Sequence, residues 1–422
     1  MSSHKGFTLI ELLVVIAIIA ILAVVVVLTI NPAQLMAESR DANRVSDMAT
    51  LQSALNLLIT DGAAGGTAPY LGSPNTVYVS LPDPTISGAA TSTCASLGLP
   101  ALPTGDTYQC SSPQDYRNAN GTGWIPVNFN ATSLGSTPLD SLPVDPTNAS
   151  SSGLYYTYVT NGSQYEVTAL PESAKQKASL AQSPEIPDYP DVIAAGTNLA
   201  LSPLWSSQGL VGWWPLDEGT GSTAYDQSGN ENNGTWSGTM ASPNSTYYGT
   251  GKVYPYAGWF DGTNNDVNLG NPTILQITNA ITIALWVNPS SLPTYSAFIS
   301  NFQGGSYNNG AFAMRMISGN LITNFFFSSG SSLQIAQSFN TKNTWSYFVA
   351  TYDGSHGVVY LNGKSFATGN ATGSITYSQG YNWLIDGTYP GGSGIPGSIN
   401  DVRIYNRALS PAEVMALYNA EK

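Results

Sequence analysis

An apolar run near the start of the chain constrains the fold more than any other feature. Residues 7–30 contain a single charged side chain, that of Glu11. An apolar helix of roughly 20 residues is long enough to cross the hydrocarbon core of a bilayer. His4 and Lys5 precede the run, and positive charge near a membrane helix favours the cytoplasmic side. We therefore expect a single-pass helix in the cytoplasmic membrane, with the C-terminus and the bulk of the chain outside.

The apolar run continues into an amphipathic stretch that ends near Thr60. Apolar residues recur there at the spacing of one helix face. They are Leu35, Val45, Met48, Leu51, Leu55, Leu58 and Ile59. The pattern predicts one long helix over residues 7–61. Asn31 and Pro32 should bend or loosen it, because proline lacks a backbone donor and clashes with the preceding turn.

Glu11 distinguishes this segment from a plain membrane anchor. A carboxylate inside a membrane helix is costly, and it usually has a defined partner. Residues 6–11, Gly-Phe-Thr-Leu-Ile-Glu, closely resemble the processing site of type IV prepilins and pseudopilins. The resemblance implies that a prepilin peptidase removes residues 1–6 by cutting after Gly6, and that the new amine of Phe7 is methylated. It also implies that Glu11 pairs with the Phe7 ammonium of a neighbouring subunit during assembly.

Residues 62–171 have the composition of a small β-rich head. The glycine-rich stretch from Gly62 to Gly66 should end the helix, and two β-prone runs flank Asn161-Gly162, which is a strong hairpin signal. We expect a small antiparallel sheet laid on the helix, so that the first half of the chain is an α+β pilin module. Cys94 and Cys110, the two cysteines of the chain, are expected to form a structural disulfide. A metal or redox pair is the alternative, but the spacing is not that of a CxxC motif.

The segment from Asp140 to Asn148 is rich in Asp, Pro and Asn. These residues favour turns, which is our preferred interpretation. A calcium loop is the alternative, since some pseudopilins hold calcium near their final strands. Residues 172–204 resemble a linker, with a short helix expected near residues 173–181 before a proline-rich stretch.

Residues 205–422 have a different character. Short aromatic runs alternate with turn signals, a pattern typical of all-β sandwiches. Asn362-Gly363 predicts a tight turn, and Ser410 with Glu413 predicts a capping box at the start of a C-terminal helix. The region resembles the laminin G-like, concanavalin A-like jelly-roll family. The segments that carry the resemblance are residues 214–219, 225–230, 260–262, 351–354, 360–364 and 399–410.

The same fold houses glucanases, so catalysis has to be argued from the residues. Retaining glycosidases need two carboxylates about 5 Å apart. Beyond residue 200 the glutamates are Glu218, Glu231, Glu413 and Glu421, and their spacing does not match that of a glucanase strand. The remaining histidine after leader removal, His356, falls in a turn. We therefore expect a binding protein and not an enzyme.

By resemblance to lectin-type jelly rolls, the second domain is expected to bind a glycan and, as a cofactor, Ca²⁺. The candidate calcium ligands are Asp226, Asp217, Asn400 and Asp401, with turn formation as the alternative role for these residues. Aromatic residues expected in or beside loops, where they could stack on sugars, are Tyr247, Tyr248, Tyr254, Tyr256, Tyr307, Tyr381 and Trp383.

Charge excludes one class of partner. The net charge is -13 and charged residues make up only 9% of the chain, so a nucleic-acid contact, which needs a basic patch, is not expected.

Together these features predict a type IV pilus subunit that leaves the membrane for an extracellular filament and displays a lectin-like domain. A minor or tip adhesin that attaches to cells, surfaces or polysaccharide is favoured. The alternatives are a pseudopilin of a type II secretion or DNA-uptake system, a structural major pilin with a spacer domain, and an anchored glycan hydrolase.

Glu11 gives the first test. In a Glu11→Ala or Glu11→Leu variant, the helix should still enter the membrane, but the Phe7 ammonium of the neighbouring subunit loses its partner. We expect normal membrane levels and no variant protein in sheared filaments, measured by immunoblotting of both fractions. Wild-type filament yield from either variant would contradict the pairing.

Overall fold

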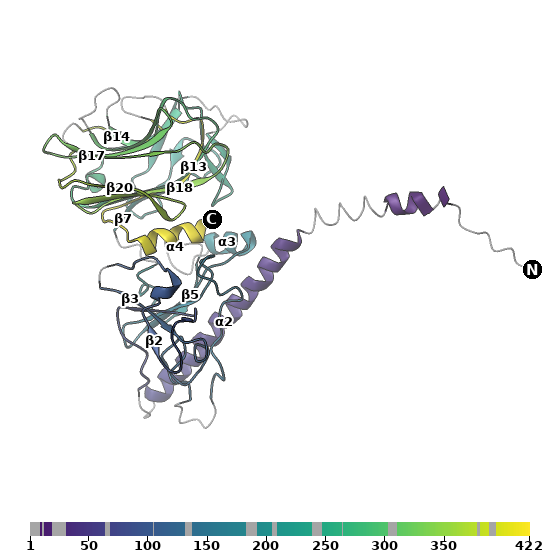
Figure 1. Cartoon of the computed structure of the whole chain (residues 1–422). Coiled ribbons are helices and arrows are strands. Elements are labelled where there is room, and N and C mark those ends of the chain that lie inside the picture. The colour runs from purple at the N-terminus through teal and green to yellow at the C-terminus, as the bar shows by residue number, and fades with distance from the viewer. Residues whose placement is uncertain are drawn as a thin grey trace, which may run out of the picture.

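A computed structural model describes residues 9–10, 12–18, 31–63, 68–103, 105–130, 137–182, 192–204, 209–238, 247–263, 265–302, 310–377, 380–387 and 394–422. Two folded modules are present (Figure 1). The first, which we call the head, holds a long helix, a sheet and a short helix. The second, which we call the sandwich, holds two larger sheets. A C-terminal helix lies between them.

The long helix, α2 (Pro32–Ala63), begins where the sequence predicts a break. Asn31 has a left-handed φ of 42°, so the helix starts at the proline that follows. Proline is favoured at this first position, where its missing N–H has no intrahelical partner to lose. Met48, Leu51, Leu55 and Leu58 form the predicted buried stripe.

Two residues predicted for that stripe lie elsewhere on α2. Leu35 and Val45 are exposed, because the helix face that continues the stripe towards the N-terminus is polar. Asp41 and Arg44 occupy it, and both are buried.

The sheet of the head has six strands within the described residues, in the order β2-β3-β1-β4-β5-β6. The strands are β1 (Thr76–Val79), β2 (Thr91–Ser92), β3 (Thr107–Ser111), β4 (Thr157–Thr160), β5 (Tyr165–Ala169) and β6 (Ile193–Gly196). The hairpin of β4 and β5 turns at Asn161-Gly162, as predicted. The purely antiparallel sheet expected from the sequence is wrong in one place, because β1 and β3 run parallel. The long crossover between them, which includes a 3₁₀ turn at Ala95–Leu97, permits this pairing.

Part of the predicted linker belongs to the head. The expected short helix is present as α3 (Ala174–Gln182), but residues 193–196 form strand β6, which pairs with β5. Ile193 and Ala195 point towards α2, so this strand completes the core beneath the helix.

The disulfide between Cys94 and Cys110 is present, with the Cα atoms 5.3 Å apart. Both cysteines are buried on the side of the sheet that faces away from α2. A crosslink that closes a loop of about 16 residues stabilises a fold by roughly 3 kcal/mol in the loop-entropy estimate.

The second module is an all-β sandwich, consistent with the predicted jelly roll. One sheet contains β7 (Leu210–Trp214), β10 (Tyr248–Thr250), β11 (Tyr256–Phe260), β13 (Ile281–Pro289), β18 (Ser346–Tyr352), β19 (His356–Leu361), β20 (Lys364–Asn370) and β22 (Gly397–Tyr405). The other contains β8 (Thr223–Ala224), β9 (Gly234–Gly238), β12 (Asn265–Gly270), β14 (Tyr295–Phe302), β15 (Gly310–Ile317), β16 (Asn320–Phe326), β17 (Ser332–Ser338) and β21 (Trp383–Ile385). A 3₁₀ turn, Thr273–Leu275, precedes β13.

Local signals in this module are confirmed. Asn362 and Gly363 both have positive φ and join β19 to β20, which is the tight turn predicted. The C-terminal helix is α4 (Pro411–Glu421), with Ser410 as its N-cap and a complete capping box to Glu413.

Helix α4 lies between the two modules (Figure 1). Alternate residues of β13 face opposite ways: Ile283, Leu285 and Val287 fill the space between the sheets, and Ala284 and Trp286 face outward. In the head, Val159 and Leu170 point away from α2. These outward faces and α4 form one hydrophobic cluster that includes Val414 and Leu417. The modules therefore share a core.

Ion pairs hold α2 to the loops of the head. Arg44 is fully buried; its Nε lies 2.7 Å from Asp145 and its Nη1 lies 2.8 Å from Asp41, and it also bonds to Glu172. Arg40 pairs with Glu172 as well. Burial alone would raise the pKa of Glu172, but its bonds to Arg40 and Arg44 lower that pKa to about 2.

The ion pairs also explain the segment from Asp140 to Asn148. The carboxylate of Asp145 accepts hydrogen bonds from the backbone of Thr147 and Asn148, as the turn interpretation predicts. Asp145 also accepts a hydrogen bond from the guanidinium of Arg44. Its carboxylate is therefore balanced by the positive charge of an arginine side chain.

A buried glutamate lies where the chain leaves the head. Oε2 of Glu166 accepts hydrogen bonds from the backbone N–H of Leu201 and Ser202, at 2.9 and 2.8 Å. Its Oε1 has no hydrogen-bond partner among the described residues. Burial raises the pKa of Glu166 to about 7.

This group should make stability depend on pH. Its pKa is higher in the folded chain than the ordinary 4.5, so the folded state binds the extra proton and stability falls as the pH rises from about 4.5 to above 7. The loss by pH 8 should be on the order of 3 kcal/mol in the free energy of unfolding. We expect Glu166→Gln to flatten this fall in denaturant titrations at pH 5 and pH 8. Glu231→Gln, at an exposed position, is the control. If the free energy of unfolding of Glu166→Gln falls between pH 5 and pH 8 as much as that of the wild type, the assignment to Glu166 is contradicted.

Candidate functional site

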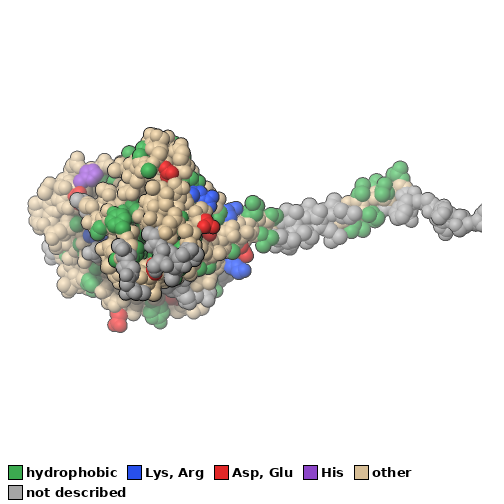
Figure 2. Space-filling view, turned by 90° about the horizontal axis from the view of Figure 1, so that it is seen from below, with side chains coloured by type: hydrophobic (Ala, Val, Ile, Leu, Met, Phe, Trp, Pro, Cys, Tyr) green, Lys and Arg blue, Asp and Glu red, His purple; other side chains and the backbone are tan. Residues whose placement is uncertain are grey.

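The predicted processing and assembly residues Gly6, Phe7 and Glu11 lie outside the described residues. The described part of this segment, residues 9–10 and 12–18, is helical. Its apolar side chains are exposed, Leu9 by 81% and Ile16 by 57%. Figure 2 shows them gathered on the narrow N-terminal segment, whereas the visible face of the body is largely uncharged and polar. Within the described ranges no helix combines the length and apolarity needed to cross a bilayer.

The first predicted calcium residue, Asp226, organises its own loop. Its Oδ1 accepts hydrogen bonds from the backbone of Trp213 and Ser228, and its Oδ2 accepts one from the backbone of Asn232. Both carboxylate oxygens therefore bond to amide hydrogens, which matches the alternative of turn formation.

Asn400 is buried and bonds to backbone on both sides. Its side-chain oxygen accepts from the N–H groups of Lys252 and Val253, each at 3.0 Å. Its amide donates to the carbonyl of Pro215. Asn400 thus ties strand β22 to two neighbouring segments.

Asp401 belongs to a buried charged cluster beside α4. It accepts a hydrogen bond from the indole of Trp213 at 2.6 Å and pairs with Arg403 at 3.1 Å. Arg403 also pairs with Glu421 at 3.1 Å, and Glu421 accepts from the indole of Trp286 at 2.7 Å. Burial and the nearby Asp401 raise the pKa of Glu421 well above its ordinary value. Two carboxyl groups here share one guanidinium.

The fourth predicted residue, Asp217, lies near the carboxyl groups of Glu218 and Asp401. Within the described ranges no three His, Cys, Asp or Glu side chains converge as metal ligands do. Because hard Ca²⁺ needs six to eight oxygen ligands and Asp226, Asn400 and Asp401 are committed to protein donors, the four residues do not fit a common calcium site. Calcium binding stays a prediction.

Most of the aromatic residues expected to stack on sugars are buried or half-buried. Tyr247, Tyr248 and Trp383 are buried, and Tyr254 and Tyr381 are half-buried. Tyr307 lies outside the described residues. Tyr256 is 49% exposed. Sequence reasoning missed Tyr225, which is 51% exposed; its place after the short strand β8 was not evident from the sequence.

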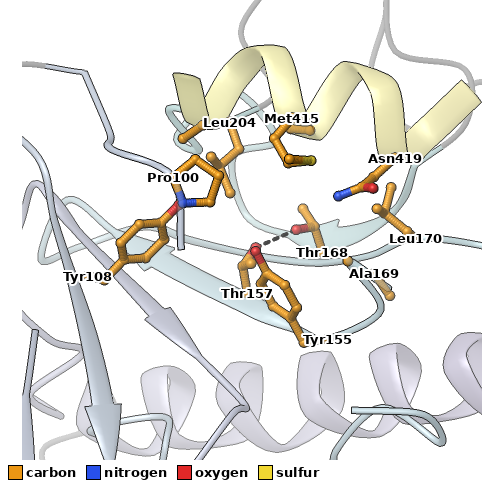
Figure 3. Close-up of a pocket in the computed structure, with 13 residues that line it drawn as sticks. Pro100, Tyr108, Tyr155, Thr157, Thr168, Ala169, Leu170, Leu204, Met415 and Asn419 are labelled. Atoms are coloured by element: carbon orange, nitrogen blue, oxygen red, sulfur yellow. Dashed lines mark hydrogen bonds between the residues drawn. The ribbon is translucent and has the colours of Figure 1, made fainter. Parts of the chain in front are cut away.

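Cavities at the junction of the modules differ in size and character. Figure 3 shows a small one, of about 30 Å³, between the head sheet and α4. Tyr155, Leu170 and Met415 line it, and the hydroxyls of Thr157 and Thr168 bond to each other at its base. A space of this size holds a water molecule and not a ligand.

A larger cavity, of about 760 Å³, is lined by Leu99 of the head, Asn362 of the sandwich and Tyr418 of α4, among others. A third, which we call the junction cleft, has a volume of about 620 Å³. Helices α2 and α3 supply one wall through residues such as Gln34 and Ala178, and the sandwich supplies the other through Asp217 and residues 252–255. Its volume is within the range of roughly 300–1,000 Å³ found for ligand pockets, and domain interfaces are common places for them.

Two family models match the chain. The prokaryotic N-terminal methylation motif matches residues 1–27, and the concanavalin A-like lectin/glucanases superfamily matches residues 261–415. Among proteins with curated descriptions, none matches.

Several solved structures resemble half of this chain. The binding domain of Paraclostridial Mosquitocidal Protein 1 is 16% identical with a TM-score of 0.41, and the receptor binding domain of botulinum neurotoxin C/D mosaic serotype is 13% identical with a TM-score of 0.40. Each comparison covers 50% of this chain and about half of the other, 52% and 51%. Domain 4 of AbnA, a GH43 extracellular arabinanase from Geobacillus stearothermophilus solved with arabinotriose, is 19% identical with a TM-score of 0.39, over 50% of this chain and 98% of that domain.

The chain therefore joins the N-terminal methylation motif of type IV pilins to a concanavalin A-like, lectin-like domain.

Proposed function

We propose that this protein is a minor or tip subunit of a type IV pilus, and that its sandwich attaches the filament to cells, surfaces or polysaccharide. The observation that carries the proposal is the combination of the methylation motif at residues 1–27 with a lectin-like domain packed onto the head. The motif implies a prepilin peptidase, the cytoplasmic membrane and other pilin subunits as successive partners. The exposed apolar side chains of residues 9–10 and 12–18 suit contacts with other helices, first in the membrane and then in the filament.

Binding is favoured over catalysis by the roles of the glutamates in the second half. Glu413 caps α4, and Glu421 pairs with Arg403. Glu218 accepts a hydrogen bond from the backbone of Tyr225. Retaining glycosidases need two carboxylates about 5 Å apart at the scissile bond. Three of the four glutamates beyond residue 200 thus have structural contacts, which supports a glycan ligand and not a glycan substrate.

Immunogold microscopy of producing cells, with an antibody to residues 205–422, tests the location. We expect label at filament tips or at sparse points along filaments. Dense, regular label along every filament would instead indicate a structural major subunit with a spacer domain. Label confined to the envelope, without filaments, would indicate a pseudopilin.

The attachment role is tested on surfaces coated with polysaccharide or host-cell material. Fab fragments against the sandwich should reduce cell attachment at least tenfold, whereas Fab fragments against the exposed head loop around Tyr70 should not. Equal cell attachment in the presence of either Fab fragment would contradict the proposal that the sandwich mediates attachment.

A further inference from the structure

The junction cleft has charged side chains of both signs on its walls. Lys177 of α3 and Lys252 of the sandwich bring positive charge. The ammonium of Lys177 bonds to the backbone carbonyl of Lys422, and that of Lys252 lies 5.0 Å from the ring centre of Trp286. Carboxyl groups come from Glu172, Asp217 and Glu421.

Asp217 differs from the other two carboxyl groups. Glu172 is held by Arg40 and Arg44, and Glu421 by Arg403 and Trp286. Within the described part of the chain, the donor to the side chain of Asp217 is its own backbone N–H. Burial, then Glu218 and Asp401, raise the pKa of Asp217 to about 6. A partly desolvated carboxyl group in a cleft at a module boundary is a common feature of binding sites.

An exposed aromatic residue directly follows the lining in the sequence. Tyr256 is not itself a lining residue, but its neighbour Pro255 is. The ring of Tyr256 packs against Gly219, where an added Cβ would lie 2.7 Å from the ring atom Cε2. Gly219 also has a φ of 70°. A side chain at this position is therefore disfavoured both by the contact with the ring and by the backbone conformation. One part of the ring is thus supported by the loop that carries Asp217, and 49% of the residue is exposed.

The mixed lining indicates the chemical class of the ligand. Carboxylates repel an anion and ammonium groups repel a cation, so a strongly charged ligand gains little. A neutral saccharide has hydroxyls that both donate and accept hydrogen bonds, and apolar ring faces that pack on aromatic rings.

We propose that the cleft between head and sandwich is a binding site for a neutral saccharide, built jointly by both modules. Asp217 accepts hydrogen bonds from sugar hydroxyls, Tyr256 packs against a sugar ring at the edge of the cleft, and α3 closes the opposite side. This inference rests on the proposed attachment function and names the site that performs it. It also implies that the sandwich alone is an incomplete receptor.

Binding of the intact, detergent-solubilised chain to immobilised laminarin, dextran and arabinan tests the site. We expect Asp217→Asn and Tyr256→Ala each to weaken binding at least tenfold. The exposed Tyr70→Ala and Glu231→Gln are matched controls that should bind like the wild type. Binding is compared only among variants whose thermal unfolding midpoint equals that of the wild type, so that loss of binding is separated from loss of fold.

A third variant tests the contribution of the head. Ala178 is exposed on α3 and lines the cleft, so Ala178→Trp should block it without disturbing the core; Ser179→Trp, on the same helix but outside the lining, is its control. Wild-type binding by Asp217→Asn and Tyr256→Ala would overturn the site and leave the attachment function intact. Loss of binding in those two but not in Ala178→Trp would overturn the joint site. No binding of the wild-type chain to any of the three polymers would overturn the site and count against a glycan-binding function.

Discussion

The burial of α4 between two sheets is the contact on which the rest of this structure depends. Pro411 is the one exposed residue of this helix, and its other side chains are buried or half-buried. A helix that is buried on all sides needs partners on all sides. The head sheet and the outer face of the sandwich supply them, through Leu170 on one side and Trp286 on the other. Without α4, both sheets would expose an apolar face to water.

Buried charges fix α4 on the sandwich. Arg403 of β22 pairs with Asp401 of the same strand and with Glu421 at the end of α4, and Glu166 holds the chain as it leaves the head. Burying ions is costly and adds little net stability, but removal of one partner is strongly destabilising. The Arg403 cluster therefore favours one position of α4 on the sandwich, where apolar contact alone would allow several.

Local sequence signals predicted the elements well and the contacts between them poorly. Asn31-Pro32, Asn161-Gly162, Asn362-Gly363 and the Ser410 capping box each act within a few residues, and the structure has all four where expected. The sequence predicts a linker where strand β6 lies, because this strand is short and is defined by its pairing with β5, which local sequence signals do not show.

Contacts between distant residues explain the remaining differences. Arg44 lies 101 positions from Asp145, and Trp213 lies 188 positions from Asp401. No periodicity in the sequence links such pairs. The predicted calcium residues illustrate the same point, because the Asp and Asn side chains that suit a cation also suit backbone amides, and only the fold decides between them.

The most direct test of this account is hydrogen exchange of α4 in the intact protein, measured by mass spectrometry of peptides from α4, β5 and β13. If α4 is the shared core of the two modules, its amides exchange as slowly as those of the two strands that flank it, and all three open together when denaturant is added. Rapid exchange of α4 under native conditions, with β5 and β13 still protected, would mean that the modules are tethered and not joined, and would contradict the account.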